Sequence, residues 1–180
     1  QMSNELVPLK DQQMMAEAIV KSGFYGFKDI NQVMAVMVVA QAENKHPGTV
    51  VQEYDIIQGR PALKSQAILA RFQQAGGKIE YHTYADDKVE MTFSHPSGGS
   101  LKLAWTLKQA QEIGLAGKDN WKKYPRAMLK ARVVSEGVRA VYPACILGHY
   151  AVEEVQDFEP RKAPEIVVPH IEIVDEIEEE

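Results

Sequence analysis

The chain of 180 residues is predicted to fold as α+β, with an antiparallel β-meander packed against helices. Residues 79–84, 89–93 and 101–105 alternate between apolar and polar side chains and are separated by turn residues, as in a three-stranded meander. Apolar residues recur at helical spacing on both sides of this segment. Acidic residues and repeated prolines then mark the end of the chain as polar and flexible. We therefore predict one folded domain over residues 1–155 and an acidic, disordered tail over residues 156–180.

Before the meander, the sequence predicts two helices, a strand and a third helix. The expected ranges are a helix over 8–22, a helix over 31–44, a strand over 49–57, a turn over 58–61 and a helix over 63–75. Asp29 or Asn31 can cap the second helix, because either side chain can accept hydrogen bonds from the first free backbone N–H groups. β-branched residues favour the strand, and Gly76 and Gly77 end the third helix.

The second helix is apolar on nearly every side between Val33 and Ala40. A helix with this composition is expected to be buried on more than one face. Either a central position in the domain core or a contact between subunits would provide that burial.

After the meander, Thr106 can cap a short helix over 107–113, and a long helix is expected from Pro125 to Val141. Proline is tolerated in a first helical turn because the missing N–H would have no partner there. Pro143 ends the long helix, since proline cannot continue it.

The apolar residues of the long helix form two groups when each residue is advanced by about 100°. The first group is expected to pack on the sheet and comprises Ala127, Ala131, Val134, Val138 and Val141. Leu129 and Val133 form the second group, which indicates another contact, either with a neighbouring subunit or on a second side of the same domain. Basic residues flank the first group, with Lys123, Arg126 and Lys130 on one edge and Arg132 and Arg139 on the other.

The segment from Gly117 to Tyr150 is strongly basic, with seven basic and two acidic residues between positions 118 and 139. The net charge of −5 hides this asymmetry, because residues 153–180 carry −9 and residues 1–152 carry +4. A basic domain with an acidic tail is typical of proteins that bind nucleic acids. The alternative is a solvated acidic terminus without a role. Trp121 and Tyr124 could stack on bases or, as is commoner at the start of a helix, anchor it in the core.

The sequence offers little for catalysis or metal binding. The five histidines lack ligand spacing, and the single Cys145 cannot build a zinc site or an internal disulfide. The glycine-containing stretch 114–119 is too short for a phosphate-binding loop and has Asp119 where Ser or Thr would hold magnesium. We expect no cofactor, no metal and no enzymatic activity. The alternative is a metal-dependent nucleic-acid-processing enzyme that uses Asp86 and Asp87 in a turn between strands.

The order of elements and several motifs resemble the RecT/Red-beta family of phage single-strand annealing proteins. The matching residues are Gly117–Trp121, Pro125–Leu129, Arg132, Arg139, Tyr142-Pro143 and Gly148–Tyr150, with Ala67–Arg71 and Gly76-Gly77 upstream. The resemblance covers roughly residues 30–155. The chain is short for the family and ends in a brief acidic tail in place of a longer helical region.

The resemblance implies ATP-independent binding of single-stranded DNA and annealing of complementary strands in phage-type homologous recombination, by an oligomeric ring or helical filament. A basic groove would hold the phosphates through Lys118, Lys122, Lys123, Arg126, Lys130, Arg132 and Arg139, with Arg60 and Lys64 on the opposite wall and Trp121 as an anchor. Expected partners are single-stranded DNA, annealed duplex DNA, further copies of the chain and a host single-strand-binding protein. The acidic tail could compete for the groove or contact that host protein.

The expected location is the cytoplasm of a bacterial host cell, with a phage or prophage gene as the source. A lone cysteine fits a reducing compartment, and the sequence contains neither a signal-peptide pattern nor an apolar run long enough to span a membrane. A non-enzymatic assembly protein whose basic helix binds an acidic partner is a further alternative function.

Overall fold

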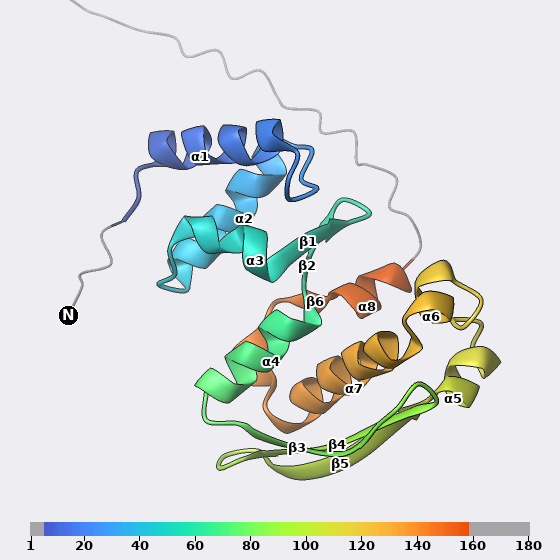
Figure 1. Ribbon diagram of the computed structural model, residues 1–180. Helices are drawn as coiled ribbons and strands as arrows, with labels where there is room; N and C mark the ends of the chain where they lie inside the picture. Colours follow the sequence, from blue (N-terminus) through green and yellow to red (C-terminus); the bar gives the residue numbers. More distant parts are fainter. Residues whose placement is uncertain (1–5, 159–180) are drawn as a thin grey trace, which may run out of the picture.

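The computed structural model describes residues 6–158 and has the mixed α+β fold that the sequence predicts (Figure 1). The helices are α1 (Leu9–Ser22), α2 (Ile30–Ala42), α3 (Val50–Glu53), α4 (Ser65–Gln74), α5 (Leu107–Glu112), α6 (Asp119–Lys123), α7 (Pro125–Val141) and α8 (Val152–Gln156), with 3-10 turns η1 (Pro47–Thr49) and η2 (Pro143–Ile146). The strands are β1 (Tyr54–Ile57), β2 (Arg60–Leu63), β3 (Lys78–Tyr84), β4 (Lys88–His95), β5 (Gly99–Thr106) and β6 (Tyr150–Ala151). Most of the predicted tail, from residue 159 onward, lies outside the described residues. Within residues 6–158, no helix combines the length and the apolar content needed to cross a membrane.

The molecule consists of an upper part and a lower part in the view of Figure 1. The lower part is the sheet β3-β4-β5 with α7 across one face, and α4 packs against α7. The upper part contains α1, α2, α3 and the β1–β2 hairpin. Strand β6 connects them, because it pairs in parallel with β2 through Ala62↔Tyr150 and Leu63↔Ala151. Segments almost ninety residues apart therefore meet in a second small sheet.

The meander is confirmed with nearly the predicted strand limits. β3, β4 and β5 are consecutive antiparallel neighbours. Val89, Met91 and Phe93 of β4 are fully buried, whereas the residues between them are only partly buried. This alternation arises because successive side chains of a strand point to opposite faces and α7 covers only one of them.

The long helix occupies the predicted residues, but its faces are turned differently from the expectation. Gly137 lies against the ring of Phe93 in β4, Arg126 lies over Tyr84 of β3, and Glu136 accepts a hydrogen bond from Trp105 of β5. The side of α7 between these positions therefore faces the sheet, and by helical spacing it carries Leu129 and Val133, which are both fully buried.

The group expected to pack on the sheet is instead turned toward the opposite side, where α4 lies. Ala131, Val134 and Val138 are buried there, whereas Ala127 near the helix start is exposed. Of the two alternatives for Leu129 and Val133, burial on a second side of the same domain is correct. The error arose because two apolar faces are indistinguishable on a helical wheel until their partners are known.

Helix α2 begins after Asp29, whose carboxylate accepts hydrogen bonds from the backbone N–H groups of Asn31 and Gln32. Its buried residues Val33, Val36, Met37 and Ala40 lie on one face. Val38 and Val39, on another face, are 51% and 42% exposed. Within the single chain α2 is therefore buried on one face, against the core, and the expected burial of a second face is not met.

The predicted strand over 49–57 is correct only at its end. Residues 47–53 form η1 and α3, because the ring Nδ1 of His46 accepts a hydrogen bond from the N–H of Gly48 and Thr49 Oγ1 donates to the His46 carbonyl. The predicted turn over 58–61 is also too long. Gln58 and Gly59 alone form it, with positive φ at both positions as in a tight β-hairpin, and β2 follows at once.

Replacing Gly137 with alanine should destabilise the fold, although alanine is normally the better helix former. A Cβ atom at this position would lie 2.4 Å from the ring of Phe93, which is fully buried and cannot move aside cheaply. We expect the free energy of unfolding in urea to fall by about 1–3 kcal/mol, as in other overpacked cores. Gly117→Ala is the matched control, because no atom lies within 4 Å of a Cβ there. Equal stabilities of the two variants would contradict this packing.

Candidate nucleic-acid interface

The unbalanced basic residues lie around α6 and the start of α7. Lys118, Lys122 and Lys123 are all exposed. Trp121, between them in sequence, is only 4% exposed and belongs to the hydrophobic core. Its indole therefore anchors α6 and holds the neighbouring lysines at the surface, and its ring is not open to a nucleic-acid base.

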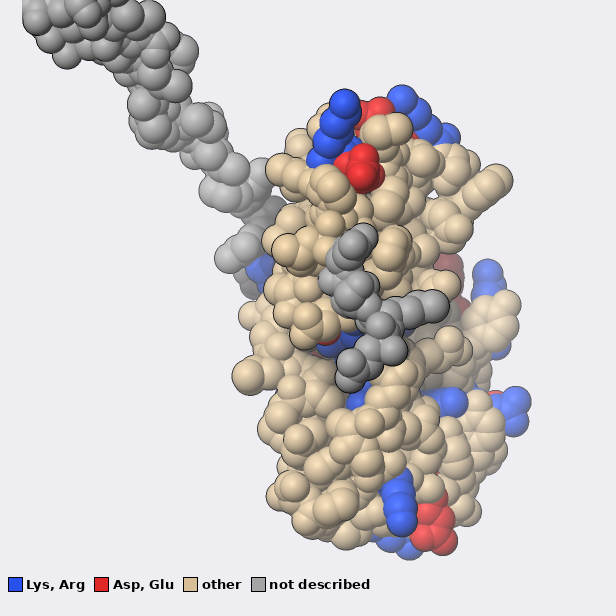
Figure 2. Space-filling view, turned by 90° about the vertical axis from the view of Figure 1, so that its left-hand side faces the viewer, with Lys and Arg blue, Asp and Glu red and all other residues tan. Residues whose placement is uncertain are grey.

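Figure 2 shows the face that forms the left-hand side of Figure 1, and this face carries few charged side chains. Basic and acidic residues lie next to each other at its top and bottom. Helix α6 lies at the right-hand side of Figure 1, away from this face.

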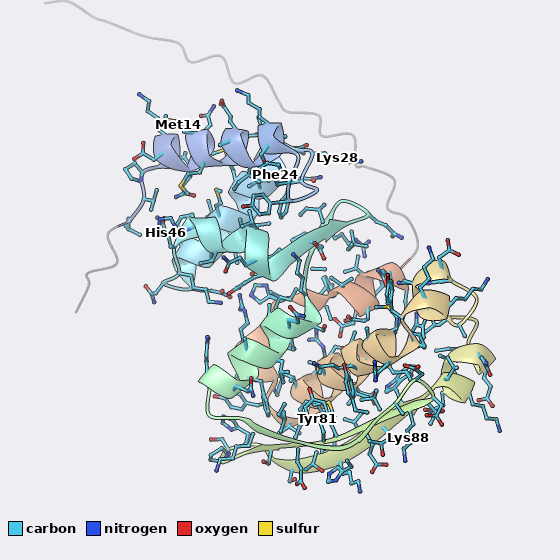
Figure 3. The ribbon with its side chains drawn as sticks, viewed as in Figure 1. Met14, Phe24, Lys28, His46, Tyr81 and Lys88 are labelled. Carbon is cyan, nitrogen blue, oxygen red and sulfur yellow. The ribbon has the colours of Figure 1, made fainter. Side chains whose placement is uncertain are left out.

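Two tyrosines of β3 lie beside the basic edge of α7 that carries Arg126 and Lys130. The guanidinium carbon of Arg126 lies 5.0 Å from the ring centroid of Tyr84. Lys130 Nζ lies 5.7 Å from the centroid of Tyr81 and 5.9 Å from that of Tyr84. The two rings pack edge to face, 5.7 Å apart, and are 43% and 48% exposed. We call these four residues the β3–α7 patch; Figure 3 shows Tyr81 between β3 and α7.

A β-bulge places both tyrosines on the same side of β3. Residues three apart in a regular strand point to opposite faces. The β3–β4 register shifts between Tyr81 and Thr83, so Tyr81 pairs with Met91 and Tyr84 with Val89. Both partners belong to the face covered by α7. The bulge therefore turns Tyr84 back beside Tyr81, which is a common use of bulges at sheet edges near functional sites.

The cations of the β3–α7 patch are only weakly neutralised. Arg126 Nε lies 3.7 Å from a carboxylate oxygen of Asp86, and both side chains are more than half exposed. Such a pair contributes little, because water screens it. Around Lys130, no carboxylate within residues 6–158 lies at ion-pair distance. Two positive charges are thus held beside two open aromatic rings.

The second basic edge of α7 is neutralised by the segment around α8. The two terminal nitrogens of the Arg132 guanidinium, Nη1 and Nη2, donate to Asp157 at 2.7 and 3.1 Å. Arg139 donates to both oxygens of Glu154, at 2.6 and 2.7 Å, and also to the backbone carbonyl of His149. Bidentate, charge-assisted pairs of this kind are strong. Arg132 and Arg139, predicted as phosphate contacts, therefore already hold carboxylates of their own chain.

Arg60 and Lys64 lie away from α6 and α7. Arg60 belongs to an open groove of about 580 Å³ whose lining comes from α2, the β1–β2 hairpin, residues 148–150 and Phe158, and includes no residue of α6 or α7. Lys64 Nζ lies 3.6 Å from a carboxylate oxygen of Asp55. The structure thus separates the two predicted walls into distinct surfaces.

A partly buried ionic network that no sequence pattern indicates joins the upper and lower parts. The guanidinium of Arg71, 8% exposed, donates to Glu43 at 3.1 and 2.9 Å, to Glu53 at 2.6 Å and to the hydroxyl of Tyr54 at 3.3 Å. His149 Nε2 lies 2.6 Å from Glu43. These residues come from the end cap of α2, from α3, β1 and α4, and from the segment before β6, so no local motif reveals them.

The network shifts the protonation of its members. Burial by itself would raise the pKa of both Glu43 and Glu53, but hydrogen bonds and charge from Arg71, together with His149 and Lys45, outweigh it and lower both pKa values. Burial raises the pKa of Tyr54 to about 12. The two carboxylates are therefore ionised, and the tyrosine neutral, over the whole physiological range.

Replacing Arg71 with methionine should destabilise the protein at pH 7 by about 3 kcal/mol, because two partly buried carboxylates lose the guanidinium that they share. Both carboxylates have lowered pKa values, so their stabilising contribution is present above their ordinary pKa of 4.5 and is lost as the pH falls through the lower folded values. The deficit relative to the unmodified chain should accordingly shrink in acid, as measured by urea unfolding between pH 7 and pH 3. Lys21→Met, which removes an exposed pair with Glu17, is the control and should change little. A deficit of the same size at all pH values would contradict this coupling.

Comparison with protein-family models, with curated proteins and with solved structures finds no match to this chain. The function proposed for the β3–α7 patch and α6 therefore rests on the residues and geometry of this chain and on the family resemblance of its motifs.

Proposed function

We propose that this protein binds single-stranded DNA through α6 and the β3–α7 patch and anneals complementary strands without ATP. The observation that carries this proposal is the placement of Arg126 and Lys130 beside the exposed rings of Tyr81 and Tyr84. Proteins that bind single strands without sequence preference combine cations for the phosphates with aromatic rings on which bases stack.

The exposed lysines of α6 extend the same surface. Lys118, Lys122 and Lys123 provide three further positive charges next in sequence to α7. Contacts made mainly to phosphates leave the Watson–Crick edges of the bases free, which annealing requires. Arg132 and Arg139 support this surface from within the domain, since their carboxylate partners fix the position of α8 against α7.

An annealing protein of this kind needs no covalent chemistry, and we propose that it is not an enzyme. Of the two acidic residues that the metal-dependent alternative would use, Asp86 forms only an exposed, solvent-screened pair with Arg126. Glu90, on the adjacent strand β4, pairs with Lys88 and Lys102, whose hydrogen bonds lower its pKa to about 2. Within residues 6–158, no three His, Cys, Asp or Glu side chains are grouped as metal ligands would be.

The resemblance also supports assembly into a ring or filament in the cytoplasm of a bacterial host, with a phage or prophage gene as the source. Val38 of α2, which is 51% exposed and lies outside the groove that Val39 lines, belongs to a surface that a second copy could cover. A host single-strand-binding protein is the proposed protein partner.

The double variant Arg126→Ala with Lys130→Ala should bind single-stranded DNA roughly 25-fold more weakly at about 0.1 M salt, because each lost single-strand phosphate contact lowers the salt slope by about 0.7. The slope of log affinity against log salt should therefore decrease by about 1.4. Fluorescence anisotropy with a labelled oligonucleotide measures both quantities. Unchanged affinity and slope would overturn the assignment of this surface.

Two further variants separate charge from stacking in the same measurement. Lys10→Ala with Lys21→Ala removes two positive charges from α1 and should leave the binding constant nearly unchanged. Tyr81→Ala with Tyr84→Ala should cost about 1–3 kcal/mol per stacked base without altering the salt slope. A loss of slope in the tyrosine variant would mean that the rings only position the cations.

Annealing is tested by adding two complementary oligonucleotides in sequence, without ATP and with a chelator present. We expect the protein to accelerate duplex formation, and electron microscopy to show filaments after the second strand is added. The Arg126→Ala, Lys130→Ala variant should lose both effects. Binding without acceleration would limit the function to strand protection, and strand cleavage that requires magnesium would favour the enzymatic alternative.

A further inference from the structure

The groove beside α2 has the properties of a binding site for an apolar segment. Its volume is about 580 Å³, and it is open to solvent. Ala35, Val36 and Val39 of α2 form one side, and Ile56 and Pro61 of the β1–β2 hairpin contribute to the other. Apolar surface in an open groove is a common sign of a site for another polypeptide segment.

Apolar side chains that line the groove remain partly exposed to solvent. Val39 is 42% exposed although it belongs to an otherwise apolar helix. Full burial of a side chain of this size stabilises a protein by about 1.5–3 kcal/mol relative to exposure. Binding of a segment that covered Val39 and its neighbours would therefore be stabilised by part of that free energy for each side chain that it buries.

The chain itself continues from this groove. Phe158, the last described residue, is part of the groove lining. Its ring lies 5.3 Å from the ring of Tyr150, edge to face, and the guanidinium carbon of Arg60 lies 4.9 Å from its centroid. These contacts fix the position of Phe158 in the groove.

The residues that follow include one segment with the matching composition. Residues 159–180 contain eight acidic and two basic side chains, yet the sequence of residues 166–174 is IVVPHIEIV, with six branched apolar residues and a single acid. Seven residues, 159–165, separate it from Phe158 and can span up to about 25 Å when extended. Glu165 and Glu172 in and beside this segment complement the positive charge of Arg60 on the groove wall.

We propose that residues 166–174 bind the groove between α2 and the β1–β2 hairpin of their own chain. A short tether gives the segment an effective local concentration in the millimolar range, so modest apolar contacts are enough to occupy the groove. The bound segment covers Val39 and the wall that carries Arg60, and it keeps other molecules from that surface. The contact forms without DNA and is independent of the function proposed for the β3–α7 patch.

Disulfide trapping in the full chain tests this contact without DNA. The background substitution Cys145→Ser removes the only native thiol. Val39→Cys with Ile171→Cys is compared with Val38→Cys with Ile171→Cys; Val38 is the matched control because it is similarly exposed but does not line the groove. We expect the first pair to form an intramolecular disulfide about tenfold faster, since its two thiols are held close together.

Non-reducing electrophoresis and mass spectrometry distinguish the outcomes. A fast crosslink within the monomer supports the proposal, and a further Val168→Asp, Ile173→Asp pair should slow it by removing apolar contacts. Equal rates for the Val39 and Val38 pairs would overturn the proposal. A crosslink found only in dimers would also overturn it, because the groove would then hold the segment of a second copy. Circular dichroism confirms that each variant is folded, which the exposure of both valines favours.

Discussion

The burial of α7 on two sides is the constraint on which the rest of the structure depends. One side, with Leu129 and Val133, lies on the meander, and the other, with Val134 and Val138, lies toward α4. A helix enclosed in this way cannot rotate without exposing apolar surface on one side, because protein interiors are closely packed. The directions in which its two basic edges point are therefore fixed. Each edge meets a different part of the chain, and this neighbour decides whether its charges are paired or exposed.

The two edges are both basic, but their charged groups differ in how far other residues of the chain already bind them. Arg132 and Arg139 meet carboxylates from the α8 segment, which returns along the helix, and they form bidentate pairs. Arg126 and Lys130 meet the edge of β3, where a bulge places two tyrosines beside them. One edge thus stabilises the fold, and the other presents cations and aromatic rings to solvent.

A second long-range interaction decides how the upper and lower parts are joined. Arg71 of α4 binds Glu43 and Glu53 from the α2–α3 region, while β6 pairs with β2. Because the network is partly buried and ionised, it tolerates little displacement of one part against the other. The same junction forms the groove beside α2, so the contacts that hold the parts together also create a surface at which the C-terminal segment begins.

The sequence by itself determined the local structure with repeating patterns: the meander, the cap at Thr106, and the limits of α7 from Pro125 to Val141. These depend on periodicity, capping and proline chemistry, which act over a few residues. Only the tertiary structure decided which face of α7 meets the sheet, and which of ten predicted contact residues are open, paired or, like Trp121, buried. Those outcomes depend on partners far away in the chain, and neither helical spacing nor local charge specifies which partner an apolar face or an arginine will meet.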